Sequence, residues 1–151
     1  MHWTAAVLQI NMEIDIRFEC SGADWKTVSE TLKRVGMAYD EPDVHRRAFE
    51  ASHTTMFVYH ATQLIGFGRA ISDGVYQAAV YDVAVVPEFQ EKGIGTVIMK
   101  KILERVSGCN VILYASPGKE EFYRKMGLRK MKTGMALFRK AAAMTKKGFT
   151  E

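Results

Sequence analysis

A long apolar run stands directly before a glycine turn and a helical pattern, and this order constrains the fold most. The run YQAAVYDVAVV (76–86) predicts a strand that ends at Pro87, because proline cannot donate to a sheet ladder. After the turn, apolar residues recur at helical spacing from about Gly95 to Val106. A turn between a strand end and a helix start points unpaired backbone N–H groups outward, and the helix dipole adds about half a positive charge there. The stretch therefore indicates an anion site.

The turn itself contains Gly93 and Gly95, which lack Cβ atoms, can adopt positive φ angles and let a phosphate approach the backbone. Gly-x-Gly alone is also typical of a plain turn. The stretch is not the dinucleotide fingerprint, which needs a third glycine at a set spacing, nor a P-loop, which needs Gly-Lys-Ser/Thr. A phosphate cradle of another kind and a plain turn both remain open at this point.

Hydrophobic periodicity in the rest of the chain predicts a mixture of strands and helices. Alternation predicts strands at 13–19, 54–60, 64–71 and 110–115, and helical spacing predicts helices at about 21–36, 42–52 and 118–127. The segment 128–140 alternates around Gly134 and predicts a hairpin. The expected fold class is α/β (α+β), with a mixed, mainly antiparallel sheet whose faces are covered by helices.

Length and composition favour one globular domain, since 151 residues with 48% hydrophobic and 25% charged content can bury an ordinary core. We expect a flexible N-terminal extension at 1–12, a single domain at 13–140 and a lysine-rich tail at 141–151. That tail could extend a strand, form a short helix or fray.

Charge and cysteine content exclude several classes of function. The net charge of +4 comes from scattered basic residues without interleaved aromatics, which predicts no nucleic-acid partner. No apolar stretch approaches the roughly 20 residues of a membrane span, and no cationic start resembles a signal peptide, so we expect a soluble, cytoplasmic protein without membrane attachment. Cys20 and Cys109 are expected to be reduced structural thiols. The four histidines have no metal-like spacing, so no metal is expected.

Two motifs resemble those of the GCN5-related N-acetyltransferase (GNAT) superfamily. The stretch QEKGIG (90–95) resembles its acetyl-CoA signature Gln/Arg-x-x-Gly-x-Gly/Ala, and EFYRKMGL (121–128) is similar to its Phe-Tyr-x-x-x-Gly-Phe element, with Leu128 in place of Phe. The resemblance covers roughly 13–140. The stretch 64–95 looks most like small bacterial members and the plastid arylalkylamine (serotonin) acetyltransferase branch.

The resemblance implies a GNAT fold of about six to seven strands and about four helices, in which the strand before the signature and the strand at 110–115 run parallel but splay apart. Acetyl-CoA is then a cosubstrate, with no metal. Its pantetheine arm lies on the backbones of Val83 and Val85. Ser116 matches the position where many relatives bond this arm with Asn, although a helix N-cap explains it equally well. The pyrophosphate is implied to lie on Gln90, Glu91, Lys92, Gly93, Ile94, Gly95 and Thr96.

The implied reaction is direct attack by the primary amine of a small molecule on acetyl-CoA in a ternary complex. The resemblance places the oxyanion donor at the Val83 N–H and the leaving-group acid at Tyr123. Asp82 is the one carboxylate in its apolar strand, and it is expected to be a general base or a structural residue that bonds nearby backbone; a water chain could replace it as the base. Alternation places Asp82 on the face opposite Tyr81 and Val83 unless a bulge intervenes.

The acceptor is expected to be an amine with an apolar or aromatic body that contacts Tyr81, while Asp40, Glu41 and Asp43 would attract its positive charge or form a solvated loop. Two alternatives stay open: a protein lysine or N-terminal acetyltransferase, and a non-catalytic acyl-CoA-binding module on the same fold. A homodimer is also compatible with the sequence.

Overall fold

The structure is a computed structural model that describes residues 12–151. The extension predicted at 1–12 lies outside the described residues apart from Met12. The chain divides into two compact units, one that ends at Leu113 and one that begins at Tyr114, and each is described by itself. The domain boundaries expected from the sequence stay predictions.

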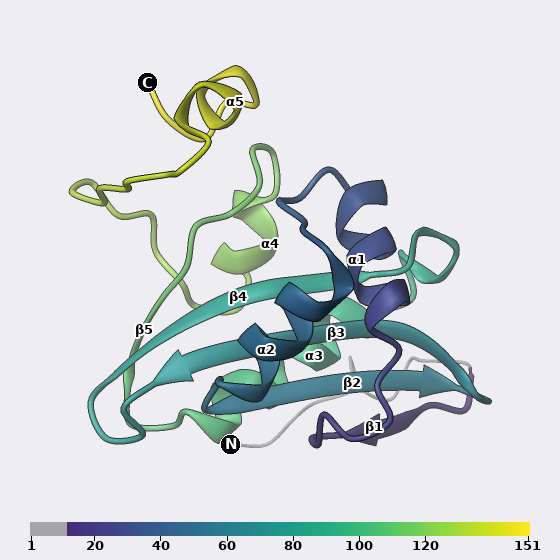
Figure 1. Ribbon diagram of the computed structural model, residues 1–151. Coiled ribbons are helices and arrows are strands. Elements are labelled where there is room, and N and C mark those ends of the chain that lie inside the picture. Colours follow the sequence, from purple (N-terminus) through teal and green to yellow (C-terminus); the bar gives the residue numbers. More distant parts are fainter. Residues whose placement is uncertain (1–11) are drawn as a thin grey trace. The chain divides into compact units, whose positions relative to one another are not determined.

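The first unit is built on a five-stranded sheet with the strands in chain order (Figure 1). Neighbouring strands pair antiparallel except the last two, which run parallel. The predicted class of fold, a mixed and mainly antiparallel sheet with one parallel pair, is therefore confirmed. The strands are β1 (Asp15–Arg17), β2 (Thr54–His60), β3 (Gln63–Ser72), β4 (Gln77–Val85) and β5 (Asn110–Ile112).

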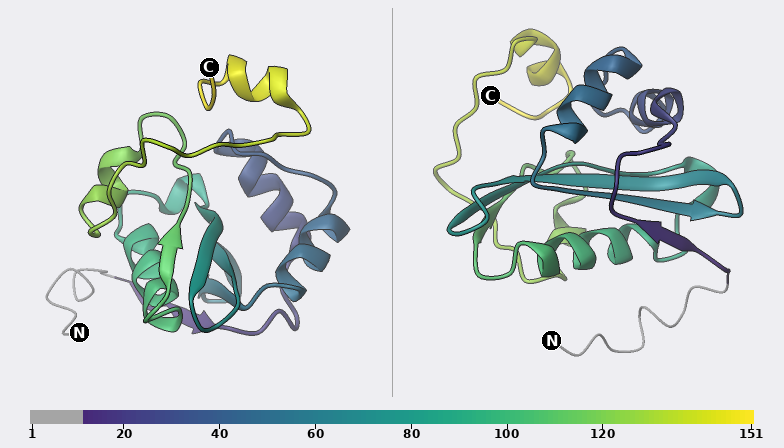
Figure 2. Two further views of the ribbon diagram at one scale, coloured as in Figure 1. Left: turned by 90° about the vertical axis from the view of Figure 1, so that its left-hand side faces the viewer. Right: turned by 60° about the horizontal axis from the view of Figure 1, so that its bottom comes forward.

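Helices cover both faces of this sheet, with α1 (Trp25–Arg34) and α2 (Pro42–Glu50) on one face and α3 (Ile94–Arg105) on the other (Figure 2). The side chain of Asp24 caps α1 by accepting the N–H of Thr27 at 3.1 Å, and α2 begins at a proline, whose missing N–H costs nothing there. A short 3-10 helix, η2 (Pro87–Phe89), joins β4 to the segment before α3.

An aromatic cluster holds α1 and α2 against the sheet. Trp25 of α1, Phe49 of α2 and Phe57 of β2 lie with ring centroids 5.5–5.7 Å apart, and Phe67 of β3 lies 6.1 Å from Phe49. The three phenylalanines are fully buried, and each contributes roughly 1.5–3 kcal/mol through burial. This cluster fixes where the last turn of α2 meets β3.

The opposite face depends on two glycines of β3. A Cβ on Gly66 would lie 2.9 Å from Cδ1 of Ile98, and a Cβ on Gly68 would lie 2.9 Å from Cδ1 of Ile102. Both isoleucines belong to α3, so the missing side chains let this helix pack closely on the centre of the sheet. The packing sets the position of the N-terminal end of α3 relative to β4.

The second unit contains α4 (Glu120–Arg124) and α5 (Ala141–Lys146) and no strand among its described residues. The hairpin predicted at 128–140 is therefore wrong. The described residues contain five strands instead of six to seven, five α-helices instead of about four, and a strand at 110–112 instead of 110–115. Alternation creates two faces, but a strand also needs a neighbour to bond its backbone and bury one face. Residues 129–137 are all exposed, Met135 and Leu137 by 96% and 86%, so neither face of this segment is buried.

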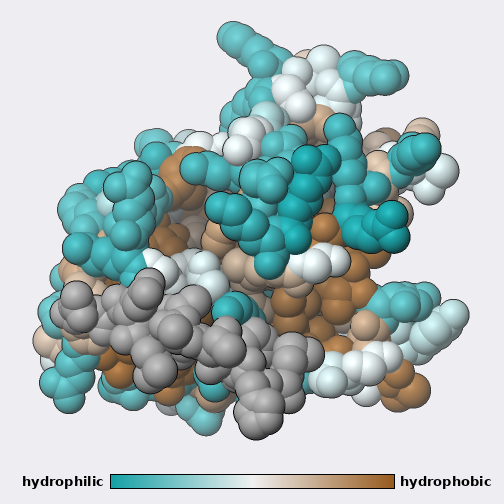
Figure 3. All heavy atoms as spheres, turned by 180° about the vertical axis from the view of Figure 1, so that it is seen from behind, coloured by the Kyte–Doolittle hydropathy of each residue, from teal (hydrophilic) through white to brown (hydrophobic). Residues whose placement is uncertain are grey.

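Apolar side chains also reach the surface, where they form brown areas between teal, polar ones (Figure 3). In the first unit, the exposed ones include Ile71 of β3 and Ile112 of β5, each about half exposed. Both are in register with Ala79 of β4, so the three residues form one row across the sheet. No helix in the described residues is long and apolar enough to cross a bilayer.

Candidate functional site

The parallel pair of the sheet separates halfway along β4. Strand β5 pairs only with the first part of β4, where Ala79 lies opposite Ile112, its last residue. Strand β4 then continues to Val85 without a partner from β5. The unpaired part, residues 80–85, is about 20 Å long at the usual rise per residue. We call it the open edge of β4.

A bulge interrupts the open edge. Arg69 of β3 lies opposite Tyr81 and Phe67 lies opposite Ala84, so Gly68 alone faces the two residues Asp82 and Val83. Asp82 has a φ of 57°, in the left-handed region. Such a two-against-one insertion changes the faces to which side chains point.

The bulge places Tyr81 and Asp82 on one face of the sheet and Val83 on the other. Both Tyr81 and Asp82 contact Arg69, which itself lies near Phe49 of α2. A Cβ on Gly68, by contrast, would lie 3.0 Å from Cγ2 of Val83, on the side of α3. The simple alternation that would separate Asp82 from Tyr81 does not occur, because the bulge intervenes.

Backbone hydrogen bonds identify the groups of the open edge that point away from β3. The space beside the open edge is here called the gap. The N–H of Val86 donates to the carbonyl of Ile65 at 2.8 Å, so Val86 faces β3. Because backbone groups alternate along a strand, Val85 and Val83 face away from β3 and toward the gap. The side-chain amide of Gln90 donates to the carbonyl of Val85 at 3.1 Å, which ties the start of the glycine turn to the open edge.

The segment from Gln90 to Thr96, here called the anion loop, continues directly from this edge. Glu91 and Gly93 have φ angles of 63° and 85°, and Gly93 is the N-cap of α3. No side chain caps α3, and Gly93 is exposed, so N–H groups of its first turn are available to a ligand. Lys92 adds a positive charge on the same exposed loop. The loop has the backbone geometry of an anion site, and the exposed Glu91 offsets the charge of Lys92.

Arg69 forms the most enclosed ion pair of the described residues. Its Nε donates to Oδ2 of Asp82 at 2.7 Å, and the two side chains are only 14% and 18% exposed. Its Nη1 donates to Oγ of Ser52 at 3.2 Å, and its Cζ lies 5.7 Å from the ring of Phe49 and 5.4 Å from that of Tyr81. Sequence reasoning considered Arg69 only as a partner for an anionic acceptor and did not pair it with Asp82, because the bulge that brings the two together has no local signal in the sequence.

The two predicted site residues of the second unit are Tyr123 and Ser116. Tyr123 lies on α4 with its ring 5.0 Å from that of Phe122, and burial raises the pKa of its hydroxyl. A tyrosine hydroxyl carries its proton at neutral pH even at its ordinary pKa, and the raised pKa leaves it so, as a proton donor requires. The carbonyl of Ser116 accepts the N–H of Lys119 at 2.9 Å, and Lys119 is the N-cap of α4. The alternative of Ser116 as a helix N-cap is therefore wrong.

The acidic connection before α2 is partly neutralised within the first unit. Arg46 and Arg47 both bond the carboxylate of Asp43, and the hydrogen bond from Arg46 is the main cause that lowers its pKa. The backbone N–H of Asp40 donates to Nε2 of the buried His45 at 2.9 Å, which fixes the turn into α2. Asp40 and Glu41 thus remain as the carboxylates best able to attract a cation.

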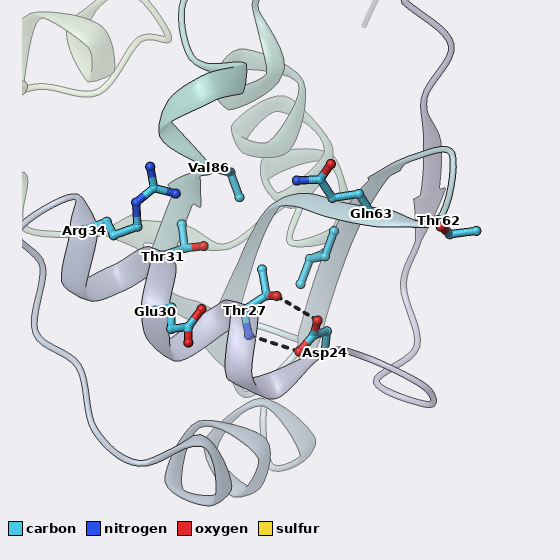
Figure 4. Close-up of a pocket in the computed structure, with 9 residues that line it drawn as sticks. Asp24, Thr27, Glu30, Thr31, Arg34, Thr62, Gln63 and Val86 are labelled. Atoms are coloured by element: carbon cyan, nitrogen blue, oxygen red, sulfur yellow. Dashed lines mark hydrogen bonds between the residues drawn. The ribbon is translucent and has the colours of Figure 1, made fainter.

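A separate polar pocket of about 240 Å³ lies beside α1 (Figure 4). Arg34, at the edge of this pocket, forms a two-pronged pair with Glu88 of η2 at 2.6 and 3.1 Å. The pocket includes none of the residues predicted for the site. Its lining is formed by Asp24, Thr27, Glu30, Thr31, Arg34, Thr62, Gln63, Leu64 and Val86.

Comparison with known families agrees with this geometry. Residues 26–138 match the family described as Acetyltransferase (GNAT) domain, and the chain belongs to this family. It is 34% identical over 119 residues to the rice protein "Serotonin N-acetyltransferase 2, chloroplastic". This alignment covers 74% of this chain and 60% of the rice protein. It is 29% identical over 119 residues to "Uncharacterized N-acetyltransferase ycf52" of Porphyra purpurea, over 77% and 64% of the two chains. The chain thus spans less than two thirds of these relatives.

Solved structures share the fold at low sequence identity. A GNAT-family acetyltransferase of Streptococcus pneumoniae superposes with a TM-score of 0.71 and 24% identity, over 85% of this chain and 99% of that one. The glucosamine-6-phosphate N-acetyltransferase of Arabidopsis thaliana superposes with a TM-score of 0.66 and 20% identity, over 84% and 99%. These similarities establish the fold alone.

The family uses acetyl-CoA, and the described residues fit it. The open edge offers unpaired backbone groups to the amides of the pantetheine arm, and the uncapped start of α3 offers N–H groups to the pyrophosphate. Within residues 12–151, no group of three or more His, Cys, Asp or Glu side chains is arranged to hold a metal ion.

Proposed function

We propose that this GNAT-family protein is an acetyl-CoA-dependent N-acetyltransferase that acts on the primary amine of a small molecule by direct attack in a ternary complex. The observation that carries the proposal is the continuous path from the open edge of β4 to the uncapped first turn of α3. Such a path matches a donor with an amide-containing arm and a pyrophosphate. The family membership supports the same reaction class.

In this proposal the donor lies on backbone groups of the first unit. Val83 and Val85 bond the pantetheine arm, and the anion loop bonds the pyrophosphate, with Lys92 adding charge. Ser116 keeps its proposed role of bonding the arm on the strength of its motif position alone. Since most of these contacts are backbone contacts, side-chain substitutions on the loop matter chiefly when they add bulk or negative charge.

The reaction needs an unprotonated amine, a donor for the oxygen that gains negative charge, and an acid for the leaving thiolate. The Val83 N–H, which faces the gap, is proposed as the oxygen donor. Tyr123 is proposed as the acid, because a tyrosine hydroxyl carries its proton at neutral pH; burial raises its pKa, which keeps the proton in place but does not strengthen the acid. The proton of the amine is proposed to leave through a water chain rather than through Asp82, the other candidate base.

For the acceptor, we propose an amine with an apolar or aromatic body. The row of Ile71, Ala79 and Ile112 lies next to Tyr81 on the same face of the sheet, about 7 Å away along β4. An aromatic ring stacked on Tyr81 would gain about 0.5–1.5 kcal/mol. The rice relative is named for serotonin, an arylalkylamine, which fits this choice.

The test is an assay of purified protein with acetyl-CoA and a panel of amines, with release of free thiol as the readout. The panel contains tryptamine, a polyamine, glutamate, glucosamine 6-phosphate and a lysine-containing peptide. We expect tryptamine to have the highest kcat/KM. If the kcat/KM of an anionic acceptor or of the peptide exceeds that of tryptamine by about tenfold or more, the proposed acceptor class is wrong. Tenfold corresponds to about 1.4 kcal/mol in transition-state binding.

A variant of Tyr123 tests the chemistry. We expect Tyr123→Phe to lower kcat by about 100-fold, within the usual range for a lost general acid, and to leave acetyl-CoA affinity unchanged. Tyr76→Phe is the control, because Tyr76 is a 63% exposed tyrosine of the turn before β4. A Tyr123→Phe protein with normal kcat, measured where chemistry limits the rate, would remove the acid assignment. If no amine releases thiol while acetyl-CoA still binds, the non-catalytic module becomes the better account.

A further inference from the structure

We propose that Arg69 and Asp82 form a latch that holds the bulge of β4 and thereby aims the Val83 N–H into the gap. Asp82 is then a positioning residue and not the general base. The inference rests on the proposed function for its catalytic meaning, but the latch itself can be tested without any reaction. Its residues all belong to the first unit.

The backbone of Asp82 adopts a conformation that needs an external contact to hold it. A residue with a Cβ atom is disfavoured in the left-handed region, and it remains there only when its surroundings hold it. Asp82 has a φ of 57° in the middle of an otherwise regular strand. The contact that its carboxylate makes at that φ is with Nε of Arg69 at 2.7 Å. The side chain of Arg69 thus accounts for a conformation that the strand alone would not adopt.

Arg69 is itself immobilised. Ser52 accepts one of its N–H groups, and the rings of Phe49 and Tyr81 both lie within 6 Å of its Cζ. Phe49 is fully buried in the aromatic cluster. A guanidinium held at this many points is a fixed anchor, and a planar group with several donors suits that task better than a flexible ammonium.

The bulge also orients Val83. Because Asp82 points to the side of Arg69, Val83 turns its side chain to the side of α3, where Gly68 leaves room for it. Its backbone then continues the alternation in which Val83 and Val85 face the gap and Val86 bonds β3. Loss of the Arg69–Asp82 pair would let the backbone of residues 81–84 relax, and the N–H of Val83 would no longer point into the gap.

The decisive variant is Asp82→Asn. Asparagine tolerates the left-handed region as aspartate does, and its side-chain oxygen still accepts from Nε of Arg69, but it is not a base. The latch predicts a kcat within about threefold of wild type, whereas loss of a general base lowers kcat by about 100-fold or more. A large loss of kcat in a folded Asp82→Asn protein would overturn the proposal.

The second variant is Arg69→Met, which keeps an apolar stem but removes the guanidinium. We expect kcat to fall about tenfold or more, with acetyl-CoA affinity changed by less than about threefold. Arg17→Met is the matched control. Arg17 likewise pairs with an aspartate, Asp15 at 2.9 Å, and stacks on a tyrosine, Tyr59 at 4.5 Å, but it lies on β1 at the other edge of the sheet.

A rescue separates the latch from a general loss of folding. Glycine adopts the left-handed region without help, so Arg69→Met combined with Asp82→Gly should recover most of the kcat lost in Arg69→Met. The double variant also removes the mostly buried carboxylate that Arg69→Met leaves without its partner. If Asp82 were the base, the double variant would be at least as inactive as either single one.

Amide hydrogen exchange over residues 81–86 keeps the test independent of the reaction. We expect exchange to accelerate about tenfold or more in Arg69→Met. It should stay near the wild-type rate in Asp82→Asn and return toward that rate in the double variant. Unchanged exchange in Arg69→Met would overturn the latch even if kcat fell. If wild type acetylates no amine but the exchange pattern holds, the proposed function fails while the latch stands.

Discussion

The bulge of β4 and the anion loop both hold a residue other than glycine in the left-handed region, but they hold it by different means. In the loop, Glu91 has a φ of 63°, and its neighbour Gln90 bonds nearby residues, the carbonyl of Pro87 through its N–H at 3.2 Å and that of Val85 through its side-chain amide at 3.1 Å. In the bulge, Asp82 is held by Arg69, thirteen residues away and on another strand.

The difference extends to solvent. The anion loop is exposed around Gly93, and its N–H groups are free of side-chain caps, as suits a segment that receives a charged ligand. The Arg69–Asp82 pair is mostly enclosed, so solvent screens the attraction between its charges less and the two side chains are held more rigidly. One region is shaped by local sequence and left open; the other is shaped by tertiary contacts and closed. Three variants test this comparison.

The largest expected effect is at Gly93. We expect Gly93→Asp to weaken acetyl-CoA binding by about 100-fold or more, because a carboxylate would meet the pyrophosphate at the start of α3. Gly108→Asp is the control, since Gly108 has a φ of 90°, follows the other end of α3 and has open space where a Cβ would stand. Titration calorimetry measures both. Equal, small losses for the two variants would show that backbone strain and not ligand charge matters at Gly93.

An intermediate effect is expected at Gly68, which faces the bulge. A Cβ there would lie 3.0 Å from Cγ2 of Val83, so Gly68→Ala should displace Val83, lower kcat about fivefold and cost about 1–3 kcal/mol of stability. Gly66→Ala is the matched variant, because its Cβ would lie 2.9 Å from the same helix but away from Val83. Urea unfolding and kcat measure the two effects. A similar fall in kcat for both variants would contradict a specific link between Gly68 and Val83.

The smallest effect is expected at Glu88, which ties the segment before the anion loop to α1. The hydrogen bond from Arg34 lowers the pKa of Glu88, so any stability from the pair is present at neutral pH and is lost as the pH falls through the lowered value. Both side chains are about half exposed, and such pairs contribute little. We expect Glu88→Gln to change acetyl-CoA affinity by less than about twofold at pH 7.

Affinity measured for Glu88→Gln at low and high salt provides the check. A change of tenfold or more would mean that the anion loop depends on this long-range tie as strongly as the bulge depends on Arg69. The proposed contrast between the two regions would then be wrong.

Sequence periodicity predicted most of the first unit. Trp25, Val28 and Leu32 recur at helical spacing and form α1, and the segment 54–60 forms β2, whose first six residues are all buried, because an apolar pattern is decided over a few neighbouring residues. The same rule failed at 128–140. There the alternation of Met131, Met135 and Leu137 is present, but no strand pairs with it, and local pattern carries no information about partners distant in the chain.

By itself, the sequence determined the family, the class of fold and the position of the glycine turn before α3. Each depends on residues close together in the chain, where Gly93 adopts its left-handed conformation without outside help. Only the tertiary structure decided that Tyr81 and Asp82 share a face and that Arg69 binds the carboxylate. A bulge is set by the register between two strands, and register depends on how side chains from β3, β4 and α2 pack together.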